Sequence, residues 1–241
     1  MIRYALLGKS LSHSFSEQYL SEKFFKEGIN NTEYINLELD DLNNLKDKIK
    51  ELNLSGFNVT IPYKIEIISK LDFISNQAKT INAVNTVKVI KGKLHGFNTD
   101  VIGFTKSIEP LLNKRKTALV LGNGGSSKTI QFALQKLNIS WKVVSRNTDF
   151  DYRQITQETI DSVDIIVNCT PLGTYPKIDE YPKLPYNLLN SKHLLYDLVY
   201  NPKQTKFLSF GLANNCSIKN GEEMLVLQAE ESWKIWNSDI R

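Results

Sequence analysis

The segment Thr117-Ala-Leu-Val-Leu-Gly122-Asn-Gly124-Gly-Ser-Ser127 decides the fold of the second half of this chain. A short apolar strand runs into a glycine-rich turn, and a helical pattern begins directly after it. Gly122 permits the tight turn, and Gly124 lets the backbone approach a phosphate, whose charge the N–H groups at the helix start can bind. Ser127 replaces the third glycine of the dinucleotide fingerprint, so a turn that only reverses the chain is the alternative.

The next strand, at 141–145, favours the dinucleotide interpretation. NAD-binding domains usually place an acidic residue at the end of this strand for the ribose hydroxyls. Here Arg146 stands about twenty residues after the turn, and its planar guanidinium suits a 2′-phosphate. An exposed arginine without a ligand is the alternative. The pattern predicts NADP (NADPH) rather than NAD, bound by Gly122, Asn123, Gly124, Gly125, Ser126, Ser145, Arg146 and Asn147.

Apolar strands alternate with helical patterns, which predicts an α/β fold with parallel strand pairing. A hairpin at Lys91-Gly92 is expected to add an antiparallel edge to the first sheet. We place the change of domain along the helix at 101–112, and the last helix can pack on either domain. The expected strands span 2–7, 33–37, 56–59, 83–90, 93–97, 117–121, 141–145, 164–167 and 194–197, and the expected longer helices span 14–27, 41–52, 101–112 and 221–236.

The composition excludes several functional classes. The 241 residues are 41% hydrophobic and carry a net charge of +4, with lysines spread among acidic residues, so we expect small-molecule partners and no nucleic acid. No apolar run suits a signal peptide or reaches the roughly 18 residues of a spanning helix, so we expect no membrane association and a cytoplasmic location. Cys169 and Cys216 lack neighbours at ligand spacing, which argues against a disulfide framework or a metal site.

Two charged residues close polar segments where loops are expected. Lys64 closes Asn58-Val-Thr-Ile-Pro-Tyr-Lys64, and Asp100 closes Gly96-Phe-Asn-Thr-Asp100. A lysine carries a proton that burial makes labile, and an aspartate can orient a hydroxyl or hold the lysine charged, so the two suit proton transfer to and from an oxygen. With a dinucleotide site, they predict hydride transfer. An ordinary ion pair is the alternative, and the sequence leaves open which of the two carries the proton.

The chain carries a series of motifs along most of its length. They are Ser12-His-Ser14-Phe-Ser16, Asn58-Val-Thr60-Ile-Pro-Tyr-Lys64, Ala83-Val-Asn85-Thr86, Asn98-Thr99-Asp100, Asn168-Cys-Thr170-Pro-Leu-Gly173, Tyr196-Asp197-Leu-Val-Tyr200-Asn-Pro202 and Gly221-Glu-Glu-Met224-Leu-Val-Leu-Gln228-Ala229. In order and spacing, these motifs resemble the shikimate dehydrogenase family. The resemblance covers nearly the whole chain. It implies a substrate domain at 1–101, on which the helix at about 221–241 can pack back, a Rossmann-like NADP-binding domain at 102–220 and a cleft between them. The implied reaction is the reversible NADP-dependent reduction of 3-dehydroshikimate to shikimate in aromatic amino-acid biosynthesis, by a monomer or homodimer.

The same resemblance implies residue roles. Lys64 and Asp100 are the catalytic pair. Ser14 and Ser16 bind the substrate carboxylate from one side of an extended loop, with capping of the next helix as the alternative. Neutral groups that read ring hydroxyls complete the substrate set, and local turn contacts or core packing are their alternatives. They are Asn58, Thr60, Asn85, Thr99, Tyr200 and Gln228. Three residues after strand ends border the cofactor, namely Thr170, Val199 and Gly221.

The chain departs from the family pattern mainly at the cofactor end. Serines stand at 126 and 127 where alanine-like residues are common, and Ser145 stands where asparagine is common. Arg153 is the candidate second clamp for a 2′-phosphate, but Asp149 and Asp151 weaken the local positive potential. One alternative function is therefore a quinate/shikimate dehydrogenase with broader substrate use or NAD dependence. A non-catalytic NADP-binding regulatory module is an alternative of another class, which the presence of the catalytic pair disfavours.

Overall fold

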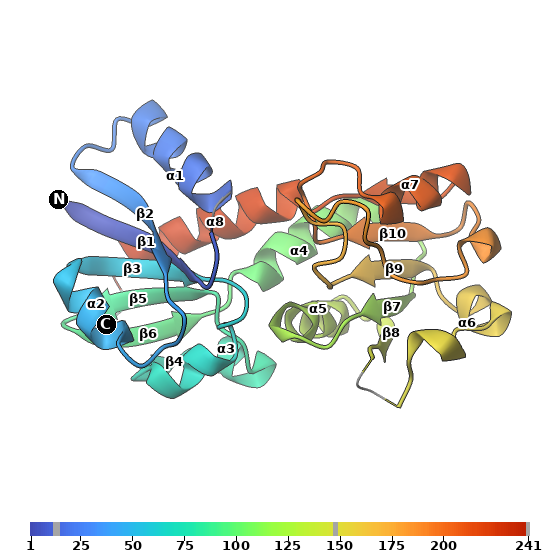
Figure 1. Ribbon diagram of the computed structural model, residues 1–241, viewed down its shortest axis with the longest axis horizontal. Coiled ribbons are helices and arrows are strands. Elements are labelled where there is room, and N and C mark those ends of the chain that lie inside the picture. The colour runs from blue at the N-terminus through green and yellow to red at the C-terminus, as the bar shows by residue number, and fades with distance from the viewer. Residues whose placement is uncertain (12–14, 147–148, 240–241) are drawn as a thin grey trace. The chain divides into compact units, whose positions relative to one another are not determined.

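The computed structural model describes residues 1–11, 15–146 and 149–239. The chain forms two compact units, Met1–Asp100 with Leu225–Arg241, and Val101–Met224 (Figure 1). Each unit is built on one β-sheet with helices packed against it, which confirms the predicted α/β fold.

The first unit contains a six-stranded sheet in the order β2-β1-β3-β5-β6-β4. Its strands are β1 (Ile2–Gly8), β2 (Thr32–Glu38), β3 (Leu54–Val59), β4 (Phe73–Ile74), β5 (Thr86–Ile90) and β6 (Lys93–Phe97). Its helices are α1 (Phe15–Lys26), α2 (Leu45–Glu51), α3 (Asn76–Ile81) and most of α8 (Glu222–Asn237). Strand β1 pairs in parallel with β2 and β3, as the alternating pattern predicted. The β5–β6 hairpin also forms, but the short strand β4 pairs outside β6, so the hairpin is not the edge of the sheet.

Alternating residues of β1 divide the core of this unit between the two faces of the sheet. Tyr4 and Leu6 pack with residues of α1 and α8, whereas Ala5 and Leu7 pack with residues of α2 on the other face. Both faces are covered, which explains why the predicted strand is apolar from Tyr4 to Leu7 on both sides. Each large apolar side chain that becomes fully buried contributes roughly 1.5–3 kcal/mol relative to leaving it exposed.

Helix α8 is attached to the sheet of the first unit near its carboxyl end. Nε1 of Trp236 donates to the backbone oxygen of Val87 at 3.0 Å, and Nζ of Lys88 donates to the backbone oxygen of Ile235 at 3.0 Å. Gly56 leaves room for the indole, because a Cβ there would lie 2.5 Å from Nε1 of Trp236. These contacts fix the part of α8 that carries Gln228 against the first unit.

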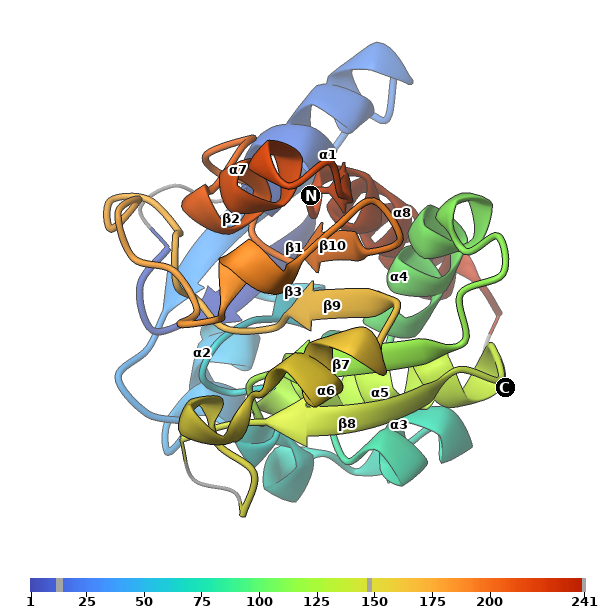
Figure 2. The same ribbon diagram turned by 90° about the vertical axis from the view of Figure 1, so that its right-hand side faces the viewer.

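The second unit contains a five-stranded, fully parallel sheet in the order β11-β10-β9-β7-β8. Figure 2 shows the part of this order from β10 to β8. Its strands are β7 (Thr117–Leu121), β8 (Ser140–Val144), β9 (Ile165–Asn168), β10 (Leu194–Asp197) and β11 (Ser217–Lys219), and its helices are α5 (Gly125–Lys136), α6 (Gln157–Asp161), α7 (Lys206–Ala213) and α4, which begins at the unit boundary (Asp100–Ile108). Parallel pairing around β7 confirms the Rossmann-like sheet. Strand β11 was not predicted, because its three residues include one apolar side chain.

Two predicted helices are shorter than expected, for local reasons. The pattern at 41–52 becomes helical only at Leu45, because the Asp41 carboxylate accepts the Asn43 N–H at 2.8 Å and forms a turn instead. The helix predicted at 101–112 is α4, which gives way at Glu109 to a 3-10 turn that contains Pro110. In the described part of the chain, no helix combines the length and apolar character that crossing a bilayer requires.

Candidate active site

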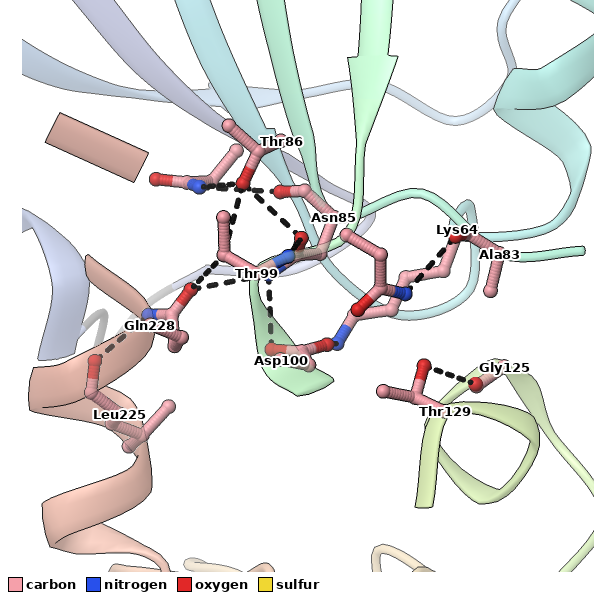
Figure 3. Close-up of polar contacts among 12 residues, drawn as sticks. Lys64, Ala83, Asn85, Thr86, Thr99, Asp100, Gly125, Thr129, Leu225 and Gln228 are labelled. Atoms are coloured by element: carbon pink, nitrogen blue, oxygen red, sulfur yellow. Dashed lines mark hydrogen bonds and ion pairs between the residues drawn. The ribbon is translucent and has the colours of Figure 1, made fainter. Parts of the chain in front are cut away.

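Lys64 and Asp100 lie in direct contact in the first unit (Figure 3). Nζ of Lys64 is 2.6 Å from Oδ2 of Asp100, and the two side chains are 15% and 6% exposed. Lys64 follows the turn after β3, where the Ile61–Pro62 peptide bond is cis, and its carbonyl accepts the N–H of Val84 at 2.7 Å. Asp100 is the first residue of α4, where the helix dipole favours a negative charge. The partly buried ammonium and carboxylate therefore form a preorganised proton donor and acceptor pair.

Asn85 connects this pair to the other predicted substrate residues. Its Nδ2 lies within hydrogen-bonding distance of three acceptors: Oδ1 of Asp100 at 3.0 Å, Oγ1 of Thr99 at 2.9 Å and Oε1 of Gln228 at 3.2 Å (Figure 3). Gln228 in turn donates from Nε2 to the carbonyl of Leu225, one turn earlier in α8, at 2.9 Å. The structure thus brings together residues that lie up to 164 positions apart in the sequence, from Lys64 to Gln228. The resulting cluster of neutral donors and acceptors beside one charged pair suits recognition of a polyhydroxylated molecule.

Asn58 lies behind this cluster, with its amide engaged inside the protein. Its Oδ1 accepts from the Tyr34 hydroxyl at 2.8 Å, and its Nδ2 donates to Oγ of Ser232 at 2.9 Å and to Oγ1 of Thr86 at 3.1 Å. Thr86 donates onward to Oδ1 of Asn85 at 3.1 Å. Asn58 is 4% exposed, so this geometry gives it a supporting place beneath Asn85.

Three residues of this supporting layer were not identified from the sequence: Tyr34, Thr86 and Ser232. Thr86 directly follows Asn85 in the sequence, and Ser232 follows Gln228 by one helical turn on α8. Both positions therefore neighbour predicted site residues. Tyr34 carries no such signal, because its contact depends on the pairing of β1 with both β2 and β3.

The two remaining described substrate candidates of the first unit lie at loop boundaries. Thr60 is half-buried directly after β3, and its N–H donates to the carbonyl of Leu7 at 2.9 Å. Ser16 is 8% exposed in the first turn of α1. Ser14 lies outside the described residues.

The glycine-rich turn of the second unit has the features of an anion site. Gly122 adopts φ +103°, a conformation that side chains disfavour, and Gly124 precedes the first residue of α5. The residue before α5, Gly124, has no side chain with which to cap the helix, and backbone N–H groups at an uncapped helix start can bind an anion. A Cβ at Gly124 would meet no atom within 4 Å, and both Asn123 and Gly124 are exposed. These observations fit a dinucleotide pyrophosphate.

Arg146 lies exposed one residue beyond Ser145, just after β8, and lines a pocket with Asp151, Tyr152 and Arg153. The Arg153 guanidinium is engaged by Asp151, with Nη2 2.6 Å from Oδ2, and this hydrogen bond lowers the pKa of the Asp151 carboxyl. The charge of Arg153 is therefore offset by Asp151. Among the described residues, no carboxylate forms an ion pair with Arg146, which borders the same pocket. This arrangement fits one basic contact for a 2′-phosphate. Asn147 lies outside the described residues.

The other residues predicted to border the cofactor lie in the segments that follow β9, β10 and β11. Thr170 donates from its hydroxyl to Oδ1 of Asn168 at 2.6 Å. Val199 is buried, Tyr200 follows it half-buried, and the N–H of Gly221 donates to the carbonyl of Val199 at 3.2 Å. A Cβ at Gly221 would lie 2.3 Å from the carbonyl oxygen of Leu198, so only glycine allows this approach.

Among the described residues, no group of three His, Cys, Asp or Glu is placed to hold a metal ion.

Comparisons with known proteins place the chain in a family. Residues 6–87 match the model of the shikimate dehydrogenase substrate binding domain. A protein of Clostridium beijerinckii named shikimate dehydrogenase (NADP(+)) is 38% identical over 246 residues, which cover 97% of this chain and 91% of that protein.

Solved structures agree over the same length. The crystal structure of shikimate dehydrogenase from Aquifex aeolicus matches with a TM-score of 0.89 and 33% identity, covering 100% of this chain and 94% of the other. The shikimate 5-dehydrogenase of Thermus thermophilus, solved in complex with NADP(H) and shikimate, matches with a TM-score of 0.86 and 29% identity, covering 98% and 94%. Sequence and fold agree over nearly the whole length, and this chain belongs to the shikimate dehydrogenase family.

Proposed function

We propose that this protein catalyses the reversible NADP-dependent reduction of 3-dehydroshikimate to shikimate, in aromatic amino-acid biosynthesis. The observation that carries the proposal is the partly buried Lys64–Asp100 contact, which Asn85 links to Gln228 through hydrogen bonds. A charged proton donor beside neutral hydrogen-bonding side chains is what reduction of a hydroxylated cyclic ketone requires. The name of the Clostridium beijerinckii relative, shikimate dehydrogenase (NADP(+)), supports the same substrate and cofactor.

The chain's own residues divide the work of this reaction. Bound NADPH supplies the hydride that adds to the ring carbonyl carbon. Lys64 donates a proton to the oxygen on which negative charge develops, and in the reverse direction it accepts that proton. Asp100 holds the ammonium in place and accepts a hydrogen bond from a substrate hydroxyl. Asn85, Thr99 and Gln228 bind further hydroxyls, because neutral groups do so without a large desolvation cost.

The binding functions are assigned to different units. The first unit holds the substrate, with Ser14 and Ser16 at the carboxylate end and Thr60 among the groups that bind hydroxyls. Asn58 supports Asn85 from behind. In the second unit, the start of α5 and Arg146 hold the phosphates of NADP, and Thr170, Val199 and Gly221 border the rest of the cofactor. Tyr200 stays a predicted substrate-binding residue. We propose further that the protein works in the cytoplasm. We also propose that it is a monomer or a homodimer, and sedimentation of the purified protein tests this oligomeric state.

The deciding experiment follows NADPH oxidation optically with 3-dehydroshikimate as substrate. NADH and quinate are assayed in parallel, together with the Lys64→Ala variant. Turnover with NADPH that is lost in the variant, while NADPH binding is retained, supports the proposed reaction and the role of Lys64 together. Equal turnover with NADH, or oxidation of quinate, would favour the broader quinate/shikimate enzyme. NADPH binding without turnover would favour the regulatory module.

A further inference from the structure

Two neighbouring strands of the second unit end in polar residues that contact each other inside the protein. Strands β9 and β10 are neighbours in the second sheet (Figure 2). β9 ends at Asn168 and β10 ends at Asp197, and the two residues are register partners in the parallel pair. Both are 0% exposed, and Nδ2 of Asn168 donates to Oδ1 of Asp197 at 2.9 Å. Neither belongs to the substrate or cofactor residues assigned above.

Asn168 holds the loop that follows β9. Its Oδ1 accepts two hydrogen bonds from Thr170, from the backbone N–H at 3.0 Å and from the hydroxyl at 2.6 Å. Because Asn168 is also tied to Asp197, the position of Thr170 depends on where the carboxylate lies.

Asp197 holds the loop that follows β10, and it does so at both ends. Its Oδ1 accepts the backbone N–H of Val199 at 3.0 Å, and its Oδ2 accepts the hydroxyl of Thr205 at 2.6 Å. Thr205 also caps α7 by accepting the N–H of Leu208 at 3.3 Å. The segment closed in this way contains Tyr200.

The buried carboxylate is costly, so its contacts matter. Burial raises the pKa of Asp197 to about 6, while its hydrogen bonds with Thr205, Val199 and Asn168 act in the opposite direction. An apolar pair at the two strand ends would avoid the cost of burial, but it would hold neither loop.

We propose that Asp197 is a positioning residue for the cofactor, whose ionised carboxylate, directly and through Asn168, holds Val199 and Thr170 in the arrangement that NADP binding requires. The inference rests on the proposed function, because it takes these two residues as the border of the cofactor site. Cofactor affinity then depends on the ionisation of a side chain that does not touch the cofactor.

The ionisable groups that face Asp197 do not titrate between pH 5 and pH 8, the range of the test below. The thiol of Cys169 lies on the β9 side, and the phenol of Tyr186 lies on the segment between β9 and β10. Burial, and then the charge of Asp197, raise the pKa of both groups, so they remain neutral as the carboxylate titrates.

Thr205 offers a test that does not delete the carboxylate. Thr205→Val removes one hydrogen-bond donor to Asp197 with little change of shape, and Thr205→Ser keeps the hydroxyl as a matched control. The dissociation constant of NADPH is measured by fluorescence titration between pH 5 and pH 8, and the unfolding midpoint of each unliganded protein is measured alongside.

We expect affinity of the wild-type protein to fall as pH drops through the pKa of Asp197. In Thr205→Val, the pH midpoint of this fall should rise, because the ionised form has lost a donor, and affinity at pH 7 should weaken roughly tenfold. Thr205→Ser should stay within about twofold of wild type. Loss of the α7 cap alone lowers stability at every pH and does not move the midpoint.

A Thr205→Val protein that is less stable but keeps the wild-type pH midpoint of NADPH binding would overturn this role for Asp197 and leave the proposed function standing. A wild-type protein that binds no NADPH at any pH would overturn both.

Discussion

The backbone N–H of Thr99 donates to Oδ1 of Asn85 at 2.7 Å, and this contact decides which way the Asn85 amide faces. A backbone N–H can only donate, so the atom it meets must be the amide oxygen. Nδ2 is then the atom that faces Oδ1 of Asp100. The orientation of Asn85, and through it the donor offered to the carboxylate of Asp100, is thus set by the main chain.

Asn85→Asp tests this orientation. The replacement keeps an acceptor for the Thr99 N–H, but it exchanges the donor facing Asp100 for a second carboxylate oxygen. We expect kcat/KM for 3-dehydroshikimate to fall roughly 10- to 150-fold at pH 7, the value of one hydrogen bond to a charged group. The acidic limb of the pH–rate profile should move to higher pH, because two adjacent carboxyls do not both ionise readily.

Thr86→Ser is the matched control, since it keeps the hydroxyl that donates to Oδ1 of Asn85. Its pH–rate profile should coincide with that of the wild type. An Asn85→Asp enzyme whose profile is unmoved would show that the amide donor does not act on Asp100.

The residues proposed for the site were predicted from the sequence, whereas the buried residues that support them were found only in the structure. The strand at Thr117–Leu121 and the helix after it were predictable, because periodicity and glycine are local signals. Ser232 was not, although its hydroxyl lies 2.8 Å from that of Thr86. Contacts between residues 146 positions apart depend on strand register and on where α8 packs, and neither is encoded in a local pattern.

The same limit applies to the second unit. Asn168 and Asp197 were both present in quoted motifs, but their contact depends on the parallel register of β9 and β10. Conversely, the sequence raised Arg153 as a second phosphate clamp with its charge weakened by neighbouring aspartates, and the structure shows it engaged by Asp151. Short-range electrostatics was therefore predictable where long-range pairing was not.

Arg146→Ala tests which basic residue reads the 2′-phosphate. The KM for NADPH should rise at least roughly tenfold, while the KM for NADH changes little, because NADH lacks the phosphate. Arg153→Ala is the comparison, and it should raise the KM for NADPH by less, since its guanidinium is already engaged by Asp151. Equal losses with both cofactors in Arg146→Ala would remove the phosphate-reading argument.

Asp197 gives the free energy of unfolding a predictable pH dependence. Its pKa is raised from 3.8 to about 6 by burial, so the folded protein binds the proton more tightly than the unfolded chain does. The stability contributed by this proton is fully present below about pH 4 and is lost as pH rises through about 6, which amounts to about 3 kcal/mol.

Urea unfolding at several pH values, compared with Asp197→Asn, measures this contribution, and the pH-dependent difference between the two proteins should change most steeply between about pH 4 and pH 6. Acidification should therefore stabilise the unliganded fold through Asp197 while weakening cofactor binding. A difference between the two proteins that does not vary with pH would contradict the raised pKa.

Gly124→Ala separates the stability of the glycine turn from its function. Gly124 has φ −88° and ψ −172°, which an alanine adopts without strain, and its Cβ would meet no protein atom within 4 Å. The unliganded variant should be as stable as wild type, or more stable by about 0.5 kcal/mol, because the unfolded chain loses freedom. If the dinucleotide backbone occupies the open space, the added methyl group must weaken NADPH binding, by an expected tenfold or more, about 1.4 kcal/mol.

Gly122→Ala is the comparison, and it should lower the unfolding midpoint even without cofactor, because the φ of +103° at this position strains an alanine. A Gly124→Ala protein that binds NADPH as tightly as wild type would mean that the phosphates do not approach this turn.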